Sequence, residues 1–336
     1  MRKCRRGMIV GTWPFGGLTL FFLCGWLLLT AEVKAQQPPP DGEWTADAVV
    51  AESRAFTDKS LGAAQGVAVR DGKIYAYGDV YAVTPRVGVI REFSMDLVPT
   101  GRVVWLRRGG SPLIIHPTGL TWDRRFGTFL GDTIKSPEDP RKTKAKIYRL
   151  DWERAWSDGH LDNAVLDTLD DDAAINGCRP TFVTVSGKTL LATADYGSVR
   201  PEIRLYDPEL FLSARRSSAP GVVVSRILSG PYNQNLHWDA EQGRLTCVQN
   251  VIEGRGWRLD VLDLARGVAD GRVNGPGVRV QMFTFIPHNE LEGYWPIDRQ
   301  KSILVTSSPR DNLLVGVIRT TDPRPSPPTS AASEAH

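Results

Sequence analysis

The chain has 336 residues, of which 41% are hydrophobic and 24% are charged, and its formal net charge is +3. This is the composition of a globular protein, and the length allows one large all-β domain or two small ones. The excess positive charge lies in the first 35 residues, so it gives no argument for a nucleic-acid partner.

Residues 1–35 have the layout of a secretory signal peptide. Basic residues precede an apolar run from Leu18 to Leu29, and Ala35 provides a small residue for cleavage. The run is shorter than the roughly 20 residues of a membrane-spanning helix, so we expect cleavage and no membrane association afterwards. Removing five basic residues and one acidic residue changes the charge from +3 to −1. We therefore expect an exported protein, periplasmic or extracellular.

The segment QGVAVRDGKIYAYGDV, from Gln65 to Val80, recurs four times in diverged form. The copies begin at Thr118, Pro180, Asn235 and Leu291, and each consists of an alternating strand, a turn and a second strand. Their turn residues, which are Gly72, Gly127, Gly187, Gly243 and Lys301, are 55, 60, 56 and 58 residues apart. A repeat of this length built of strands predicts a β-propeller with one four-stranded blade per repeat.

Third and fourth strands are expected to follow each pair. The third strands fall at residues 87–96, 145–153, 202–208, 257–264 and 312–319, and the fourth at 102–108, 163–170, 221–228 and 278–285. The fifth repeat has no fourth strand of its own, whereas an unmatched strand at 45–56 precedes the first repeat. Pairing of that strand with the last blade would close the ring and remove exposed edges. We therefore expect five blades, with six as the alternative.

The repeat also sets the domain boundaries. We expect a flexible, proline-rich lead-in at residues 36–43, the propeller at 44–320 and a disordered tail at 321–336. Cys178 and Cys247 remain after leader cleavage. They fall in neighbouring repeats, so an oxidising compartment allows them to pair, and two separate buried thiols are the alternative.

Polar residues recur where each repeat enters its first strand and leaves its second. Connections in a four-stranded blade alternate between the two ends of the ring, so these positions are expected to converge on one mouth of the central channel. Candidate ligand-binding residues are Gln65, Arg179, Asn233 and Glu290. Candidate metal ligands, with oxygen donors suited to Ca²⁺, are Asp79, Asp132, Asp195, Asn235 and Asn250. Candidate catalytic bases are His116 and His288.

The third strands IYRLD (147–151) and IRLYD (203–207), with Asn and Asp at the channel mouth, resemble secreted β-propellers. The placement looks like the calcium-dependent lactonase and esterase propellers of the gluconolactonase and paraoxonase type. That resemblance implies a central Ca²⁺ and a hydrolytic activity. Those families have six blades, whereas the repeats here number five.

Three functions follow as hypotheses. The first is an exported propeller, expected to be a monomer, that binds a small polar ligand or a carbohydrate at the channel mouth. The second is a calcium-dependent hydrolase in which His116 or His288 moves protons. The third is a glycosidase, for which Glu290 and Asp132 are the carboxyl pair that the sequence can nominate.

Overall fold

The computed structural model describes residues 44–56, 62–80, 83–136, 139, 143–197, 201–250, 257–271, 279–283, 290–298, 301–307 and 313–320. The chain divides into a unit at 1–38 and a unit at 39–336, and all of these residues belong to the second unit. The expected leader, the lead-in, the tail and His288 lie outside the described residues.

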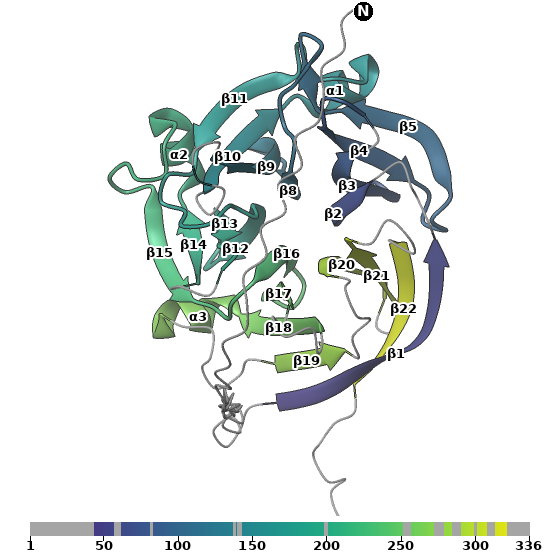
Figure 1. Cartoon of the computed structure of the whole chain (residues 1–336). Helices are drawn as coiled ribbons and strands as arrows, with labels where there is room; N and C mark the ends of the chain where they lie inside the picture. Colours follow the sequence, from purple (N-terminus) through teal and green to yellow (C-terminus); the bar gives the residue numbers. More distant parts are fainter. Residues whose placement is uncertain are drawn as a thin grey trace, which may run out of the picture. The chain divides into compact units, whose positions relative to one another are not determined.

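The second unit consists mainly of β-sheets, which have a β-propeller arrangement (Figure 1). Three sheets each contain four consecutive antiparallel strands. The first comprises β2 (Ala63–Arg70), β3 (Lys73–Val80), β4 (Val87–Phe93) and β5 (Pro99–Trp105). The second comprises β8 (Pro117–Asp123), β9 (Gly127–Lys135), β10 (Thr143–Leu150) and β11 (Val165–Asp170). The third comprises β12 (Thr181–Val185), β13 (Lys188–Ala194), β14 (Glu202–Tyr206) and β15 (Val223–Leu228). A short ladder of β6 (Arg107–Arg108) and β7 (Ser111–Pro112) lies between the first two.

An eight-stranded sheet holds the remaining strands. One half contains β16 (Asn233–Asp239), β17 (Arg244–Asn250), β18 (Trp257–Asp263) and β19 (Arg279–Phe283). The other half contains β20 (Leu291–Pro296), β21 (Lys301–Thr306), β22 (Leu313–Thr320) and β1 (Trp44–Phe56). β1 pairs antiparallel with β22, which is the pairing expected for the unmatched N-terminal strand. Its first four residues also pair in parallel with β19, a contact that the sequence did not indicate.

The first strands of the repeats pack against one another in series. β2 contacts β8, β8 contacts β12, β12 contacts β16, β16 contacts β20, and β20 contacts β2. These inner strands therefore surround a common axis, and residues at corresponding ends of them face the same opening. This arrangement is what brings polar residues from distant repeats together.

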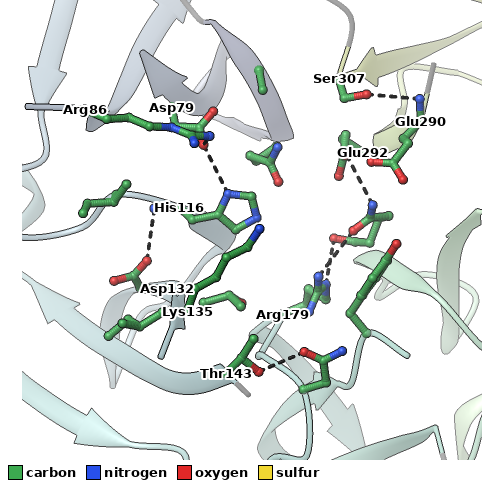
Figure 2. A pocket seen from close by; sticks show the side chains of 18 of the residues that line it. Asp79, Arg86, His116, Asp132, Lys135, Thr143, Arg179, Glu290, Glu292 and Ser307 are labelled. Carbon is green, nitrogen blue, oxygen red and sulfur yellow. Dashed lines mark hydrogen bonds and ion pairs between the residues drawn. The ribbon is translucent and has the colours of Figure 1, made fainter. Parts of the chain in front are cut away.

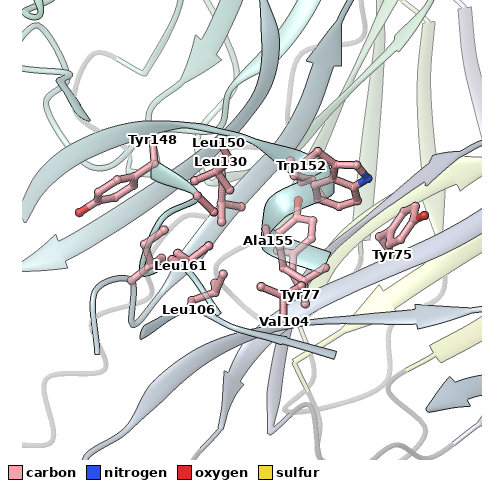
Figure 3. Close-up of a cluster of buried hydrophobic side chains, with 14 of the residues drawn as sticks. Tyr75, Tyr77, Val104, Leu106, Leu130, Tyr148, Leu150, Trp152, Ala155 and Leu161 are labelled. Carbon is pink, nitrogen blue, oxygen red and sulfur yellow. The ribbon is translucent and has the colours of Figure 1, made fainter. Parts of the chain in front are cut away.

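The hydrophobic core lies between neighbouring sheets. In one cluster, Tyr77 and Val104 from the first sheet pack with Leu130 and Leu150 from the second (Figure 3). The other clusters likewise combine side chains of two neighbouring sheets. Burial of these side chains holds each sheet against the next, at roughly 25 cal/mol for each Å² of apolar surface removed from water. Cys178 and Cys247 lie in two different clusters as separate buried thiols.

Three short helices, which were not expected from the sequence, connect third strands to fourth strands. They are α1 (Trp152–Asp158), α2 (Pro208–Ala214) and α3 (Leu264–Asp270). The residues at 151–153 and 207–208, expected to continue strands, instead begin helices because an Asp caps each one. The side chain of Asp151 accepts a hydrogen bond from the backbone N–H of Arg154, and Asp207 and Asp263 act in the same way. In the described part of the chain, no helix is long and apolar enough to cross a membrane.

Candidate functional site

A pocket of about 980 Å³ opens where the ends of the inner strands meet (Figure 2). Six of the eleven site residues expected from the sequence line it, namely Gln65, Asp79, His116, Asp132, Arg179 and Glu290. These six residues, from different repeats, thus line one pocket. Gln234 and Glu292, which were not among the candidates, line the same pocket.

β-Bulges determine which side chains reach the pocket. The pairing of first and second strands slips by one residue at Gln65 in β2, Gly119 in β8, Gln234 in β16 and Glu292 in β20. An extra residue of this kind is left out of the ladder, and the strand bends around it. Three of the four carry long polar side chains, and all three line the pocket.

Gly119 is the one bulge residue of the four without a polar side chain, and its backbone conformation explains why a glycine is needed there. Its φ is +74°, and a Cβ built there would lie 2.7 Å from the ring of Pro180. Only glycine adopts this backbone without strain at such close approach. The second sheet therefore contributes to the pocket through His116 before β8 and Asp132 within β9.

Asn233 and Asn235, on either side of the bulge residue Gln234, are buried away from the pocket. The Nδ2 of Asn233 donates to the Oγ of Ser229 at 2.9 Å, and that of Asn235 donates to the Tyr77 hydroxyl at 2.9 Å. Both amides are therefore used in holding strands together. Their expected roles as a ligand contact and a metal ligand are not supported by this placement.

Asp195 is also buried behind the pocket wall. One of its carboxylate oxygens accepts hydrogen bonds from the backbone N–H groups of Ile175 at 2.9 Å and Asn176 at 3.1 Å. The other pairs with Arg204, whose side chain is fully buried. Asp195 thus fixes the loop that carries Asn176 and Arg179 to the pocket.

Asp79 and His116 form one wall of the pocket. The Nδ1 of His116 lies 3.3 Å from the Oδ2 of Asp79, and Arg86 pairs with the same oxygen. Asp79 is fully buried, whereas a third of the His116 side chain is exposed. The carboxylate therefore orients the imidazole, whose remaining edge is open to a ligand.

Asp132 lies beside His116 on this wall. Its Oδ1 accepts a hydrogen bond from the backbone N–H of His116 at 3.2 Å. Burial raises the pKa of Asp132 to about 7, although the hydrogen bond from His116 acts in the opposite direction. This carboxyl group can therefore hold or release a proton near neutral pH.

Arg179 and Glu292 lie on another part of the wall (Figure 2), and Gln234 is hydrogen-bonded to both. The Nη2 of Arg179 donates to the Oε1 of Gln234 at 3.3 Å, and the Nε2 of Gln234 donates to the Oε1 of Glu292 at 3.3 Å. The Nη1 of Arg179 and the Oε2 of Glu292 have no hydrogen-bond partner among the described residues. Both side chains are nevertheless buried.

The surroundings of Glu292 favour its neutral form. Burial, and then the neighbouring carboxyl of Glu290, raise its pKa well above the usual range of a glutamate. Alternation could not have identified Glu292, because it is the extra residue of the bulge in β20.

The described residues do not provide a fitting calcium site. No group of three or more His, Cys, Asp or Glu side chains among them is arranged to hold a metal ion. Asp79 already pairs with Arg86, and Asp195 with Arg204, so neither carboxylate is left uncompensated. His288 and the side chain of Asn250 lie outside the described part of the chain.

Comparison with known proteins gives no family assignment. No family model matches the chain, and no curated protein matches it. Among solved structures, a protein assigned as a gluconolactonase is 14% identical, with 57% of each chain covered and a TM-score of 0.33. A mannose phosphorylase from Leishmania mexicana is 13% identical over 81% of this chain and 88% of its own, with a TM-score of 0.45.

A β-xylosidase/α-arabinofuranosidase from a compost microbial metagenome, solved with xylotriose, is also 13% identical. It covers 81% of this chain and 95% of its own, with a TM-score of 0.45. The gluconolactonase type expected from the sequence is thus among the structures to which the chain is similar. These similarities identify no function for this chain.

Proposed function

We propose that the protein binds a polar, hydroxyl-rich ligand, a carbohydrate, in the pocket at the mouth of its propeller. The observation that carries this proposal is the set of bulges on the inner strands. Each of Gln65, Gln234 and Glu292 leaves the strand ladder and lines one pocket of about 980 Å³. A bulge weakens the ladder locally, so its recurrence around one opening supports a binding role.

The unsatisfied groups in the pocket favour a ligand with many hydroxyls. A buried polar atom without a hydrogen bond costs roughly 1–3 kcal/mol, and the Oε2 of Glu292 and the Nη1 of Arg179 are two such atoms. A hydroxyl group both donates and accepts, so neighbouring hydroxyls on one sugar suit a wall in which amide, carboxyl and guanidinium groups alternate.

Binding can be tested with a panel of labelled oligosaccharides and two matched variants. Gln234→Leu removes the central amide of the pocket wall, and we expect a loss of binding of at least about tenfold, as one unpaired hydrogen bond implies. Gln249→Leu is the control, because Gln249 is equally buried on the adjacent strand but bonds Asn233 behind the wall. Equal losses in both variants, or no binding by the natural protein, would contradict the proposal.

Glycoside hydrolysis is the second candidate function. Asp132 and Glu290 lie on opposite walls of the pocket (Figure 2). Burial keeps the pKa of Asp132 at about 7, as a general acid requires, whereas Glu290 is exposed and can act as the base or nucleophile. This assignment keeps the carboxyl pair nominated from the sequence and needs no metal.

Leaving-group dependence tests this second candidate. Asp132→Asn cannot protonate a leaving group, so its turnover of unactivated glycosides should fall by at least about a hundredfold. Dinitrophenyl glycosides, whose leaving group needs no proton, should be hydrolysed at a rate close to that of the natural protein. Equal losses on both substrates, or no turnover on any glycoside, would exclude this role and leave a binding protein.

We further propose five blades, with the two halves of the eight-stranded sheet as separate blades. The contact of β20 with β2 supports this count, and so does the pairing of β1 with β22. Export is proposed from the sequence of residues 1–35 alone. Mass spectrometry of the protein recovered from the periplasm or medium would test it, since cleavage after Ala35 is expected.

A further inference from the structure

Two arginines are buried in the described part of the chain, and their surroundings differ. Arg204, fully buried, lies 3.7 Å from a carboxylate oxygen of Asp171 and 3.4 Å from one of Glu202, and it pairs more closely with Asp195. Its charge is therefore compensated several times over. This is the usual condition for a buried cation.

Arg179 forms no ion pair with a carboxylate of the described residues, and Glu292 and Asp195 act on its charge only from a greater distance. Its Nε donates to the backbone oxygen of Gln234 at 3.2 Å and its Nη2 to the Oε1 of the same residue, and both acceptors are neutral. Its Nη1 has no partner, and no carboxylate of the described chain lies within ion-pair distance of it. The guanidinium carbon lies 5.3 Å from the centre of the Tyr196 ring, which stabilises the cation but does not neutralise it.

The nearest acidic wall residue does not supply the missing charge. Gln234 lies between Arg179 and Glu292 and bonds each of them. Glu292 is itself buried beside Glu290, an environment that favours its protonated form. The direct hydrogen-bond partners of the cation are therefore neutral, and a buried charge is strongly unfavourable unless something compensates it.

We propose that Arg179 binds an acidic group of the ligand, a carboxylate or a phosphate, so that the protein recognises an acidic sugar. A guanidinium presents parallel N–H donors that match either oxyanion, and a charge-assisted bond of this kind is stronger than one between neutral groups. Lys135 lines the same pocket from the end of β9 and adds a second positive charge. Glu290 lies beside Glu292 in the pocket lining, so its carboxyl group disfavours the acidic group there and helps to set the orientation of the sugar. This inference rests on the proposed carbohydrate site.

The test compares sugars that differ only in charge. The melting temperature of the natural protein is measured with D-glucose, D-glucuronate, D-glucose 6-phosphate and inorganic phosphate, with sodium chloride keeping the ionic strength constant. We expect an increase of about 2 °C or more with the acidic sugars and none with glucose, because a ligand stabilises the state it binds. A larger increase with glucuronate assigns a carboxylate, and a larger increase with the phosphates assigns a phosphate.

Two variants localise the effect. Arg179→Gln should lose the increase, whereas Arg226→Gln, the control, should keep it, because Arg226 is not among the residues that line the pocket and is paired with Glu202. Arg179→Lys keeps the positive charge but loses the paired N–H donors of the guanidinium, so it should retain part of the increase. This variant provides the test if Arg179→Gln does not fold. An equal increase in the natural protein and Arg179→Gln would overturn the inference, as would no increase with any anion.

The same panel separates this inference from the proposed function. If neutral and acidic oligosaccharides bind equally well and depend on Gln234, the acidic specificity is wrong and the carbohydrate site stands. If no saccharide, neutral or acidic, binds to the natural protein, both are wrong.

Discussion

The Nε2 of Gln234 lies 3.3 Å from the Oε1 of Glu292, and each residue is the extra residue of a β-bulge on an inner strand. Two separate repeats thus use the same local irregularity to bring their side chains into contact at the pocket. A regular ladder at either position would have placed a neighbouring residue there instead. The bulges therefore determine the composition of this wall.

The first prediction concerns Glu292. Its pKa is raised in the folded state, so the stability that its protonated form provides is present below the unfolded pKa and lost as the pH rises through the folded value. Glu292→Gln imitates the neutral form at every pH. We expect the variant to match the natural protein near pH 4 and to be more stable by at least about 1 kcal/mol near pH 8. Urea denaturation at several pH values measures this, and a difference independent of pH would contradict it.

The second prediction concerns Asp132, whose pKa is raised to about 7 by burial. Between about pH 4 and pH 7 the unfolded chain releases this proton and the folded chain keeps it. The free energy of unfolding therefore decreases as the pH rises through this range, as it does for Glu292. Across this range the free energy of unfolding of Asp132→Asn should rise by on the order of 2–4 kcal/mol relative to that of the natural protein, with no further relative increase above pH 7. A relative gain that continues to rise well above pH 7 would show that another group is responsible.

The third prediction concerns Arg204. Replacing it with Met leaves Asp171 and Asp195 buried without their cation, which should reduce the free energy of unfolding by about 3–5 kcal/mol. Arg226→Met is the control, since Arg226 is half exposed and pairs with Glu202, and its loss should cost less than about 1 kcal/mol. Equal losses in the two variants would mean that the buried network contributes no more than a surface ion pair.

The positions of most strands, and the end of the propeller at which the pocket opens, could be predicted from the sequence. Alternation from Gln65 to Val80 and its copies identified the first and second strands, and the topology of a blade then placed Asp79, Asp132 and Arg179 near one another. Alternation cannot reveal a bulge, because one extra residue exchanges the faces of a strand. Roles at the site were therefore assigned to Asn233 and Asn235, whereas Gln234, between them, is the one of the three that lines the pocket.

The helices were missed for a different reason. The segments after Leu150 and Tyr206 are seven residues long, too short for an apolar period to identify a helix. The remaining signal was an Asp directly after each third strand, and an Asp at a strand end also suits a turn. Only its recurrence at Asp151, Asp207 and Asp263 distinguishes a helix cap from a turn.

The last prediction concerns calcium, which the resemblance to gluconolactonase-type propellers implied. At the mouth, Asp79 is already paired with Arg86 and His116, and the raised pKa of Asp132 keeps it partly protonated near pH 7. Arg179 and Lys135 line the same pocket and repel a cation. Millimolar calcium chloride should therefore change the melting temperature of the mature chain no more than magnesium chloride does. A calcium-specific increase that is lost in Asp132→Ala combined with Asn235→Ala would contradict this and restore the metal site, with ligands drawn in part from outside the described residues.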